Sequence, residues 1–422
     1  MAMAFAAQAM MSGALFRLTG GMPTNWINSR RLQVHGVILA ACLWGTYVWL
    51  VATPGILDRE GLVKGTDFVH FYTLGLLARE HRGGELYDMM AQSAYTQHLV
   101  PQAGRLYFVP LYGPQVSLLF APFAALPYGW AQWVWVIFNA AVYGACCYAI
   151  WRRCPNLQSY GGTVFLLALA YPAFFHLIAW GQSSVLALGC FTLTYLALQS
   201  ERMVIAGLAI GSLIYKPQLG LAAAVIFVLA RQWRVVVGAI SAALLQMCIG
   251  WTYYGSSVMK DYGMHLLHFR GIMAQLEPRP YQMHSLRSFW NLLIPWPEAA
   301  TVLWVASAIA VLVVAFLCWR SAPLSLRFSG LLLATVLVSP HLTVYDLVIL
   351  APAFLLIADW VLASSGALPV RRLGALSYAS YVLPLAGPLA IWTRVQLSVP
   401  AMVWLLWDMW KYSLNKTAWR SR

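Results

Sequence analysis

The carboxylate at position 67 lies among residues that could change its chemistry. Asp67 follows Gly65-Thr66 and comes just before the ring-bearing residues Phe68, His70, Phe71 and Tyr72. A carboxylate held among aromatic rings can have a raised pKa, which suits a general base. The same side chain could instead cap a helix by accepting hydrogen bonds from its free N–H groups. The pattern therefore leaves two interpretations open, a catalytic base and a helix cap.

Further polar clusters separate apolar runs later in the chain. They are Trp180-Gly181-Gln182, Tyr215-Lys216-Pro217, Met283-His284-Ser285-Leu286-Arg287 and Ser339-Pro340-His341-Leu342-Thr343-Val344-Tyr345-Asp346. A lone lysine is costly at membrane depth, so Lys216 is predicted to face a cavity or an anion, or else to snorkel to the membrane surface. His341 and Asp346 could bind a substrate, or could only cap the helix that follows them.

The composition indicates what must position these residues. Of 422 residues, 61% are hydrophobic and only 9% are charged, whereas soluble domains carry roughly 25% charged residues. The aromatic residues lie mostly in long apolar runs and not between basic clusters, so the basic character does not indicate a nucleic-acid partner. Seven cysteines without CxxC spacing favour neither a disulfide framework nor a metal site. The composition fits an all-α polytopic membrane protein in a lipid bilayer.

The apolar runs predict about twelve transmembrane helices. They cover residues 33–53, 129–151, 161–179, 183–199, 203–215, 217–230, 234–253, 298–319, 323–338, 343–363, 373–391 and 396–411. The region 203–230 could also be one helix kinked at Pro217. We predict a single membrane domain over residues 1–422. In it, 1–32 and 412–422 are cytoplasmic, and 54–128 and 254–297 are large outer loops.

The charges support this topology and place both termini on one side. That side holds 16 basic and 3 acidic residues, a net charge of +13, and the other side holds 11 basic and 10 acidic residues, a net charge of +1. Basic residues favour the cytoplasmic side. The first helix is therefore expected to be an uncleaved anchor, and Asp67 and the polar clusters are expected to face the outside.

The first outer loop is predicted to contain interfacial helices over Thr66–Glu80 and Glu85–Leu99. The apolar run 111–127 does not fit as a crossing, because counting it would move every later arginine pair to the outer side. It also carries Pro114, Pro122 and Pro127 and directly follows Pro110, and prolines break helices. We interpret it as a re-entrant or interfacial segment that could line an entrance for a lipid.

The order of the motifs along residues 60–350 is informative. The series is Gly65-Thr66-Asp67-Phe68 with Tyr72, Leu86-Tyr87-Asp88, Tyr112-Gly113-Pro114, Pro122-Phe123, Leu126-Pro127, Gly181-Gln182, Gly207 through Lys216-Pro217, and Ser339-Pro340. It resembles glycosyltransferase family 87, polyprenyl-phosphate-sugar-dependent enzymes of the GT-C superfamily that include bacterial α-mannosyltransferases.

The resemblance implies a GT-C fold in a bacterial inner membrane and assigns a role to one matching residue, Asp67. It implies that Asp67 is the base for an inverting transfer, most often of mannose, with arabinose as runner-up, from a polyprenyl-phosphate donor to a glycolipid or glycan acceptor. The expected phosphate-binding residues are His341, Lys216 and Arg287, and the expected substrate-binding residues are His70, Tyr72, Gln182, His284, Tyr345 and Asp346. No cofactor is expected. No metal is expected either, since the sequence has no Asp-x-Asp near Gly181. Ser183-Ser184 stands where many relatives have an Asn, which could alter donor or acceptor preference.

Two other classes remain possible from the residues. A transporter or flippase would also have about twelve helices broken by prolines, but the halves show no clear symmetry. A membrane acyltransferase would need a histidine base within the membrane, and the nearest candidate, His176, has no polar companion in the sequence.

Overall fold

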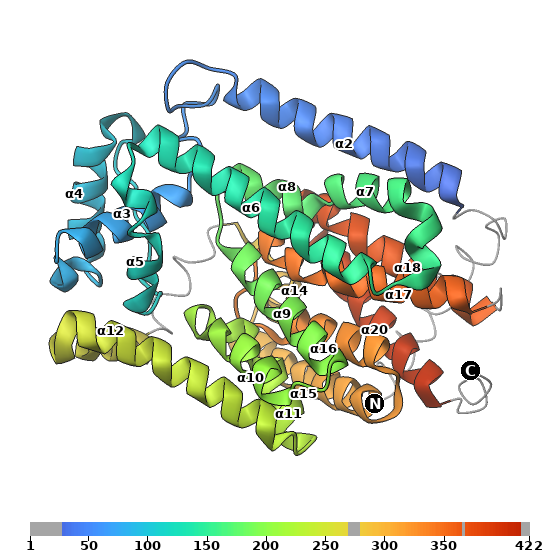
Figure 1. Ribbon diagram of the computed structural model, residues 1–422. Coiled ribbons are helices and arrows are strands. Elements are labelled where there is room, and N and C mark those ends of the chain that lie inside the picture. Colours follow the sequence, from blue (N-terminus) through green and yellow to red (C-terminus); the bar gives the residue numbers. More distant parts are fainter. Residues whose placement is uncertain (1–27, 269–278, 365–367, 415–422) are drawn as a thin grey trace.

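The computed structural model describes residues 28–268, 279–364 and 368–414. In these ranges the chain forms helices packed into one bundle, and the β-pairing consists of two isolated bridges, Leu57 with Val63 and Met283 with Thr343 (Figure 1). Of the predicted segments, residues 1–27 of the cytoplasmic segment 1–32, 269–278 of the outer loop 254–297 and 415–422 of the tail 412–422 lie outside the described residues.

Helices occupy all of the predicted apolar runs. The main ones are α2 (Ser29–Val51), α6 (Tyr128–Trp151), α7 (Gly161–Leu169), α8 (Pro172–Trp180), α9 (Ser184–Gln199), α10 (Met203–Gly211), α11 (Leu221–Leu229), α12 (Trp233–Leu267), α15 (Pro297–Ser321), α16 (Leu324–Val338), α17 (Ala351–Ala363), α18 (Leu368–Val382) and α20 (Ser398–Leu414). Within the described ranges, six helices are long and apolar enough to cross a membrane, or up to seven if a pair of helices bent by 45° is one span. The all-α polytopic membrane class is therefore confirmed, while the count of twelve crossings and the GT-C fold stay predictions.

Prolines explain where the apolar runs break. The bent pair is α7 and α8, which meet at Tyr171-Pro172, and the other break lies at Lys216-Pro217. A proline disfavours the helical conformation of the residue before it, and Lys216 accordingly has φ −134° and ψ 69°. Region 203–230 is thus two helical segments, which decides between the alternatives left open by the sequence.

The helices of the first outer loop gather at one end of the bundle. Both predicted loop helices are present, as α3 (Phe68–Arg79) and α4 (Met89–Leu99), and a short helix α5 (Gln115–Phe120) lies within the run 111–127. Figure 1 shows these helices together with the far end of α12. Phe71 of α3 stacks on Phe120 of α5, with ring centroids 4.6 Å apart. Helix α3, which begins next to Asp67, is thereby held in place by α5.

Helix α12 extends well beyond the predicted run 234–253. It breaks at Gly255, whose φ of 79° is rarely open to other residues, and continues to Leu267. Beyond the break, Val258 and Tyr262 form a small second core with residues of the first outer loop, among them Leu74 and Tyr87. The outer loop therefore packs on an extension of a long helix and does not stand alone.

Contacts at the opposite helix ends agree with the charge pattern. Arg372 forms an ion pair with Asp408 at 2.7 Å, and Asp359 accepts a hydrogen bond from the backbone N–H of Asn156 at 2.7 Å. The sequence predicts that Asp359 and Asp408 lie on the same side of the membrane as most of the arginines. The residues of the polar clusters lie at the other ends of the same helices, as described next.

Candidate active site

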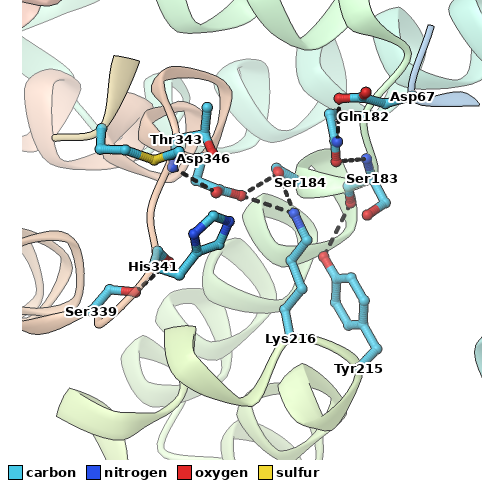
Figure 2. Close-up of polar contacts among 11 residues, drawn as sticks. Asp67, Gln182, Ser183, Ser184, Tyr215, Lys216, Ser339, His341, Thr343 and Asp346 are labelled. Carbon is cyan, nitrogen blue, oxygen red and sulfur yellow. Dashed lines mark hydrogen bonds and ion pairs between the residues drawn. The ribbon is translucent and has the colours of Figure 1, made fainter. Parts of the chain in front are cut away.

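Asp67 and Gln182 form the centre of a polar site built from distant parts of the chain. The side-chain amide of Gln182 donates a hydrogen bond to Oδ2 of Asp67 at 2.6 Å (Figure 2). The N–H of Asp67 donates a hydrogen bond to the carbonyl of Trp180 at 2.9 Å. Asp67 precedes α3, but its side chain makes no capping hydrogen bond. Of the two interpretations of Asp67, the helix cap is therefore not what the geometry shows.

The environment of Asp67 favours its neutral form. The residue is half-buried, and this desolvation raises the pKa of the carboxyl to about 6. The hydrogen bond from Gln182 and the positive charges of Lys216 and Arg279 act in the opposite direction, but with smaller effects. A carboxyl group with this pKa can accept a proton near neutral pH and release it again.

A tight turn after α8 brings Gln182 to Asp67. Gly181 ends α8 with φ 69°, in the left-handed region, and its carbonyl accepts a hydrogen bond from the indole of Trp135 at 2.9 Å. A Cβ on Gly181 would lie 2.7 Å from Cβ of Phe68, the residue next to Asp67. Only glycine satisfies both the backbone angle and this close approach.

Replacing Gly181 by Ala is expected to lower both thermal stability and any activity that depends on Asp67. The methyl group would meet Phe68 and the left-handed backbone would cost about 1–2 kcal/mol, so the turn would shift and separate Gln182 from Asp67. A matched control is Gly189→Ala in α9, where the nearest contact of the new Cβ would be an ordinary 4.0 Å. Thermal unfolding and the Asp67-dependent activity should change in the first variant only. Equal behaviour of the two variants would contradict this role of the turn.

A buried ion pair holds the site together from three other elements. Nζ of Lys216 lies 3.0 Å from Oδ1 of Asp346, and the side chains are only 5% and 2% exposed. Lys216 also donates a hydrogen bond to Ser184 at 3.0 Å, and Ser184 donates to the same oxygen of Asp346 at 2.5 Å. The prediction that Lys216 faces an anion is confirmed, and the anion is Asp346.

Asp346 also supports the local backbone. It lies in the 3-10 helix η8 (Val344–Leu350), and its Oδ2 accepts a hydrogen bond from the N–H of Thr343 at 3.2 Å. The capping role considered for Asp346 is therefore confirmed alongside its ion pair. The carbonyl of His341 accepts a hydrogen bond from Ser339 at 2.7 Å. In Figure 2 the ring of His341 points toward the place where Asp346 and Lys216 meet.

Two predicted substrate-binding residues lie on α3, close to Asp67 in the chain. His70 is buried, stacks on Phe108 with ring centroids 4.8 Å apart, and borders a small pocket that Tyr112 and Ser117 also line. Burial lowers the pKa of His70 to about 4, so the ring is neutral at pH 7. Tyr72 donates its hydroxyl hydrogen bond to the carbonyl of Leu126 at 2.9 Å. These contacts hold the outer loop around the site.

The predicted residues of the second outer loop are also fixed by protein contacts. Nδ1 of His284 lies 2.7 Å from the hydroxyl of Ser398, and burial lowers the pKa of His284 to about 3. Arg287 donates a hydrogen bond to the carbonyl of Pro340 at 3.1 Å. Tyr345 belongs to η8 and not to this loop, and its ring centroid lies 5.3 Å from Nζ of Lys216. The structure thus brings Asp67, Gln182, Lys216, Tyr345 and Asp346 into one neighbourhood.

Sequence reasoning missed two residues of this neighbourhood. Ser184 completes the Lys216–Asp346 contact, and the one signal for it was that Ser183-Ser184 replaces the asparagine of many relatives. Arg279 acts on Asp67 through its charge, although nothing in the sequence around it suggested this. Across the described ranges, no group of three or more His, Cys, Asp or Glu side chains could hold a metal ion.

The geometry so far defines an all-α membrane protein with a polar site at one set of helix ends, and one comparison with known proteins adds a family. The model of glycosyltransferase family 87 matches residues 111–340, more than half of the chain. The chain therefore belongs to glycosyltransferase family 87 and is a membrane glycosyltransferase. No curated protein and no solved structure matches it. Gln182, Lys216 and Arg287 lie inside the matched range, whereas Asp67 precedes it and Asp346 follows it.

Proposed function

We propose that this glycosyltransferase transfers a sugar, in the first place mannose, from a polyprenyl-phosphate donor to a glycolipid or glycan acceptor. The reaction takes place on the outer face of the bacterial inner membrane and inverts the anomeric carbon. The observation that carries this proposal is Asp67, a half-buried carboxylate with a pKa of about 6 that is fixed by Gln182 and not used as a helix cap.

The proposed reaction is a single displacement with Asp67 as base. The acceptor hydroxyl gives its proton to Asp67 while its oxygen forms a bond to the anomeric carbon of the donor. The bond between that carbon and the phosphate oxygen breaks on the opposite face, and the phosphate leaves with the electron pair. Because Gln182 binds Oδ2, the other oxygen of Asp67 is the one that receives the proton.

The leaving phosphate gains negative charge, so positive groups or N–H donors must lie near it. The proposed phosphate-binding residues remain His341, Lys216 and Arg287, which come from elements that meet at the site. His70, Tyr72, His284 and Tyr345 remain proposed substrate-binding residues, with Gln182 and Asp346 orienting the groups beside them.

The proposal is tested with the full-length protein reconstituted in lipid nanodiscs. The assay supplies radiolabelled polyprenyl-phosphate mannose, a parallel pentose donor and a lipid extract as acceptor source, and it measures labelled product. Transfer by the wild type that depends on Asp67 supports the proposal. A folded wild type that transfers no sugar from any polyprenyl-phosphate donor would overturn it and favour a transporter.

Chelation of divalent metal ions is expected to leave transfer unchanged. The proposed step relies on Asp67 and on protein cations, so treatment with EDTA should alter the initial rate by less than about twofold. The measurement is the initial rate before and after dialysis against EDTA. A large loss that Mg²⁺ or Mn²⁺ restores would contradict metal-independent transfer.

A further inference from the structure

A groove between α9 and α10 belongs to a part of the surface that the candidate active site does not use. Its walls are apolar side chains, Leu193 and Leu196 on α9 and Ile205 and Leu208 on α10, and its volume is about 440 Å³. Leu193 is 58% exposed and Leu208 is 41% exposed, so the walls face outward from the bundle. In a membrane protein, an outward-facing apolar groove of this kind is a place where a lipid can bind.

The length of the groove matches one leaflet of a bilayer. Its lining extends from Arg202, the residue before α10, to Ser212, the residue after that helix. A helix rises about 15 Å over this interval, which is half of the hydrocarbon layer of about 30 Å. A hydrocarbon chain in the groove would therefore extend from one membrane surface to the middle of the bilayer, as an acyl chain of a phospholipid does.

Three arginines gather at the end of the groove where Arg202 lies. Near their first turns, α10 and α12 pack so tightly that a Cβ on Gly207 would clash with the carbonyl oxygen of Val235. This packing brings the turn that ends in Arg202 close to the turn that contains Arg231, and Arg234 lies in the first turn of α12. All three arginines are exposed. We call Arg202, Arg231 and Arg234 the arginine cluster.

The positive charge of the arginine cluster is largely uncompensated. The two turns, residues 200–202 and 230–234, contain three arginines and one acid, Glu201, and so carry a net charge of +2. Within the described part of the chain, no member of the cluster forms an ion pair. Trp233 lies in the second of these turns and is 57% exposed, as is common for tryptophan at a membrane surface. Basic pockets between membrane helices on the cytoplasmic side bind anionic lipid headgroups.

We propose that the groove and the arginine cluster bind an anionic glycerophospholipid of the inner leaflet. One acyl chain lies along the groove, and the phosphate group accepts hydrogen bonds from Arg202 and Arg231, because a guanidinium group matches the oxygens of a phosphate. A zwitterionic headgroup also carries an ammonium group, which the net positive charge of the cluster repels. The arginine cluster lies on the predicted cytoplasmic side, whereas Asp67 and its partners face the opposite side.

A lipid in this groove would support the helices that carry part of the active site. α9 begins at Ser184, and the segment after α10 leads to Lys216, whose Nζ donates a hydrogen bond to Ser184 at 3.0 Å. The same two helices would be held together by the lipid toward their other ends. Because a ligand that binds only the folded state stabilises it, the lipid should raise the unfolding temperature.

The experiment uses the full-length protein in detergent and measures equilibrium binding and thermal unfolding as each probe is added. The probes are phosphatidylglycerol, phosphatidylcholine with the same acyl chains, and glycerol phosphate, which has no chain. The variants are Arg202→Gln, Arg202→Gln/Arg231→Gln and Ala209→Phe, which fills the groove that Ala209 lines. The matched control is Arg30→Gln, an exposed arginine on the same predicted side but on α2, across the bundle from α10 and α12 (Figure 1).

We expect phosphatidylglycerol to bind more tightly than phosphatidylcholine and to raise the unfolding temperature of the wild type. Its binding should weaken about fivefold in Arg202→Gln and about 25-fold in the double variant. Arg30→Gln should match the wild type, and Ala209→Phe should weaken the binding of both lipids.

Three results would overturn the proposal. They are equal binding of the two lipids, equal binding of phosphatidylglycerol by the double variant and by Arg30→Gln, and binding of glycerol phosphate as tight as that of phosphatidylglycerol. The last result would show that the groove takes no part. Since the measurement involves no sugar transfer, its outcome is independent of the proposed function.

Discussion

Replacing Asp67 by Asn is expected to lower the rate of sugar transfer by about 10²- to 10⁴-fold, the usual contribution of a general base. Asparagine keeps the shape of the side chain and leaves the N–H of residue 67 free to donate to Trp180, so the fold should persist. What is lost is the group that accepts the proton of the acceptor hydroxyl. Initial rates and thermal unfolding of the same preparation provide the measurement.

The matched control for this variant is Asp88→Asn in the same outer loop. Asp88 caps α4 by accepting hydrogen bonds from the N–H groups of Met90 and Ala91, and asparagine caps a helix about equally well. Its rate should therefore stay close to that of the wild type. If Asp67→Asn keeps a rate within tenfold of Asp88→Asn, Asp67 is not the base.

The pH dependence provides a second test of Asp67. Transfer requires the ionised carboxylate, and the pKa of Asp67 is about 6, so kcat/KM should rise with pH and level off above that value. Below it, protonation of the carboxyl should lower kcat/KM about tenfold per pH unit. This dependence should disappear from the residual activity of Asp67→Asn. A profile that is flat from about pH 5 to pH 7 would contradict the assignment.

Replacing Lys216 by Met is expected to produce the largest loss of stability, about 3–5 kcal/mol in the free energy of unfolding. The substitution removes the partner of Asp346 and leaves a carboxylate that is 2% exposed without a compensating charge. The same change releases Ser184, which accepts a hydrogen bond from Lys216. Denaturant or thermal unfolding in detergent measures the effect.

A double-mutant cycle shows whether the loss comes from the ion pair. Asp346→Asn removes the negative charge, while its one amide oxygen can still accept from the N–H of Thr343 and its NH2 group can donate to the hydroxyl of Ser184. The double variant Lys216→Met/Asp346→Asn should therefore be more stable than Lys216→Met alone. Additive losses from the two single changes would show that the pair is not coupled and that Lys216 stabilises the fold by packing.

Much of the fold could be predicted because the length of an apolar run and the position of a proline can be read from a short stretch of sequence. The apolar runs became helices, and the two loop helices appeared as α3 and α4. Lys216-Pro217 broke a helix for the steric reason that the sequence already contained. The extension of α12 past Gly255 was not predicted, because its outer part is polar and packs on a loop far away in the chain.

The site could be predicted only as a set of residues. Lys216 and Asp346 were both named, but they are 130 positions apart and nothing in their spacing indicated that they neutralise each other. For this reason the sequence predicts that Lys216 binds the phosphate group of the donor. Tyr72 and His284 were expected to bind substrate, and the structure shows them bonded to Leu126 and Ser398. Whether they also bind substrate stays a prediction.

The shortness of the helices that end at the site has a consequence for the membrane itself. α9 has 16 residues and α16 has 15, which at 1.5 Å per residue gives lengths of about 24 and 22 Å. The hydrocarbon layer of a bilayer is about 30 Å thick. In the topology predicted from the sequence, the ends near Arg202 and Arg327 lie at one surface, and these helices would then stop roughly 6 to 8 Å short of the other. A donor that diffuses within the bilayer needs to descend only a short way to that depth, whereas a nucleotide sugar from water would have to cross a region without bulk solvent.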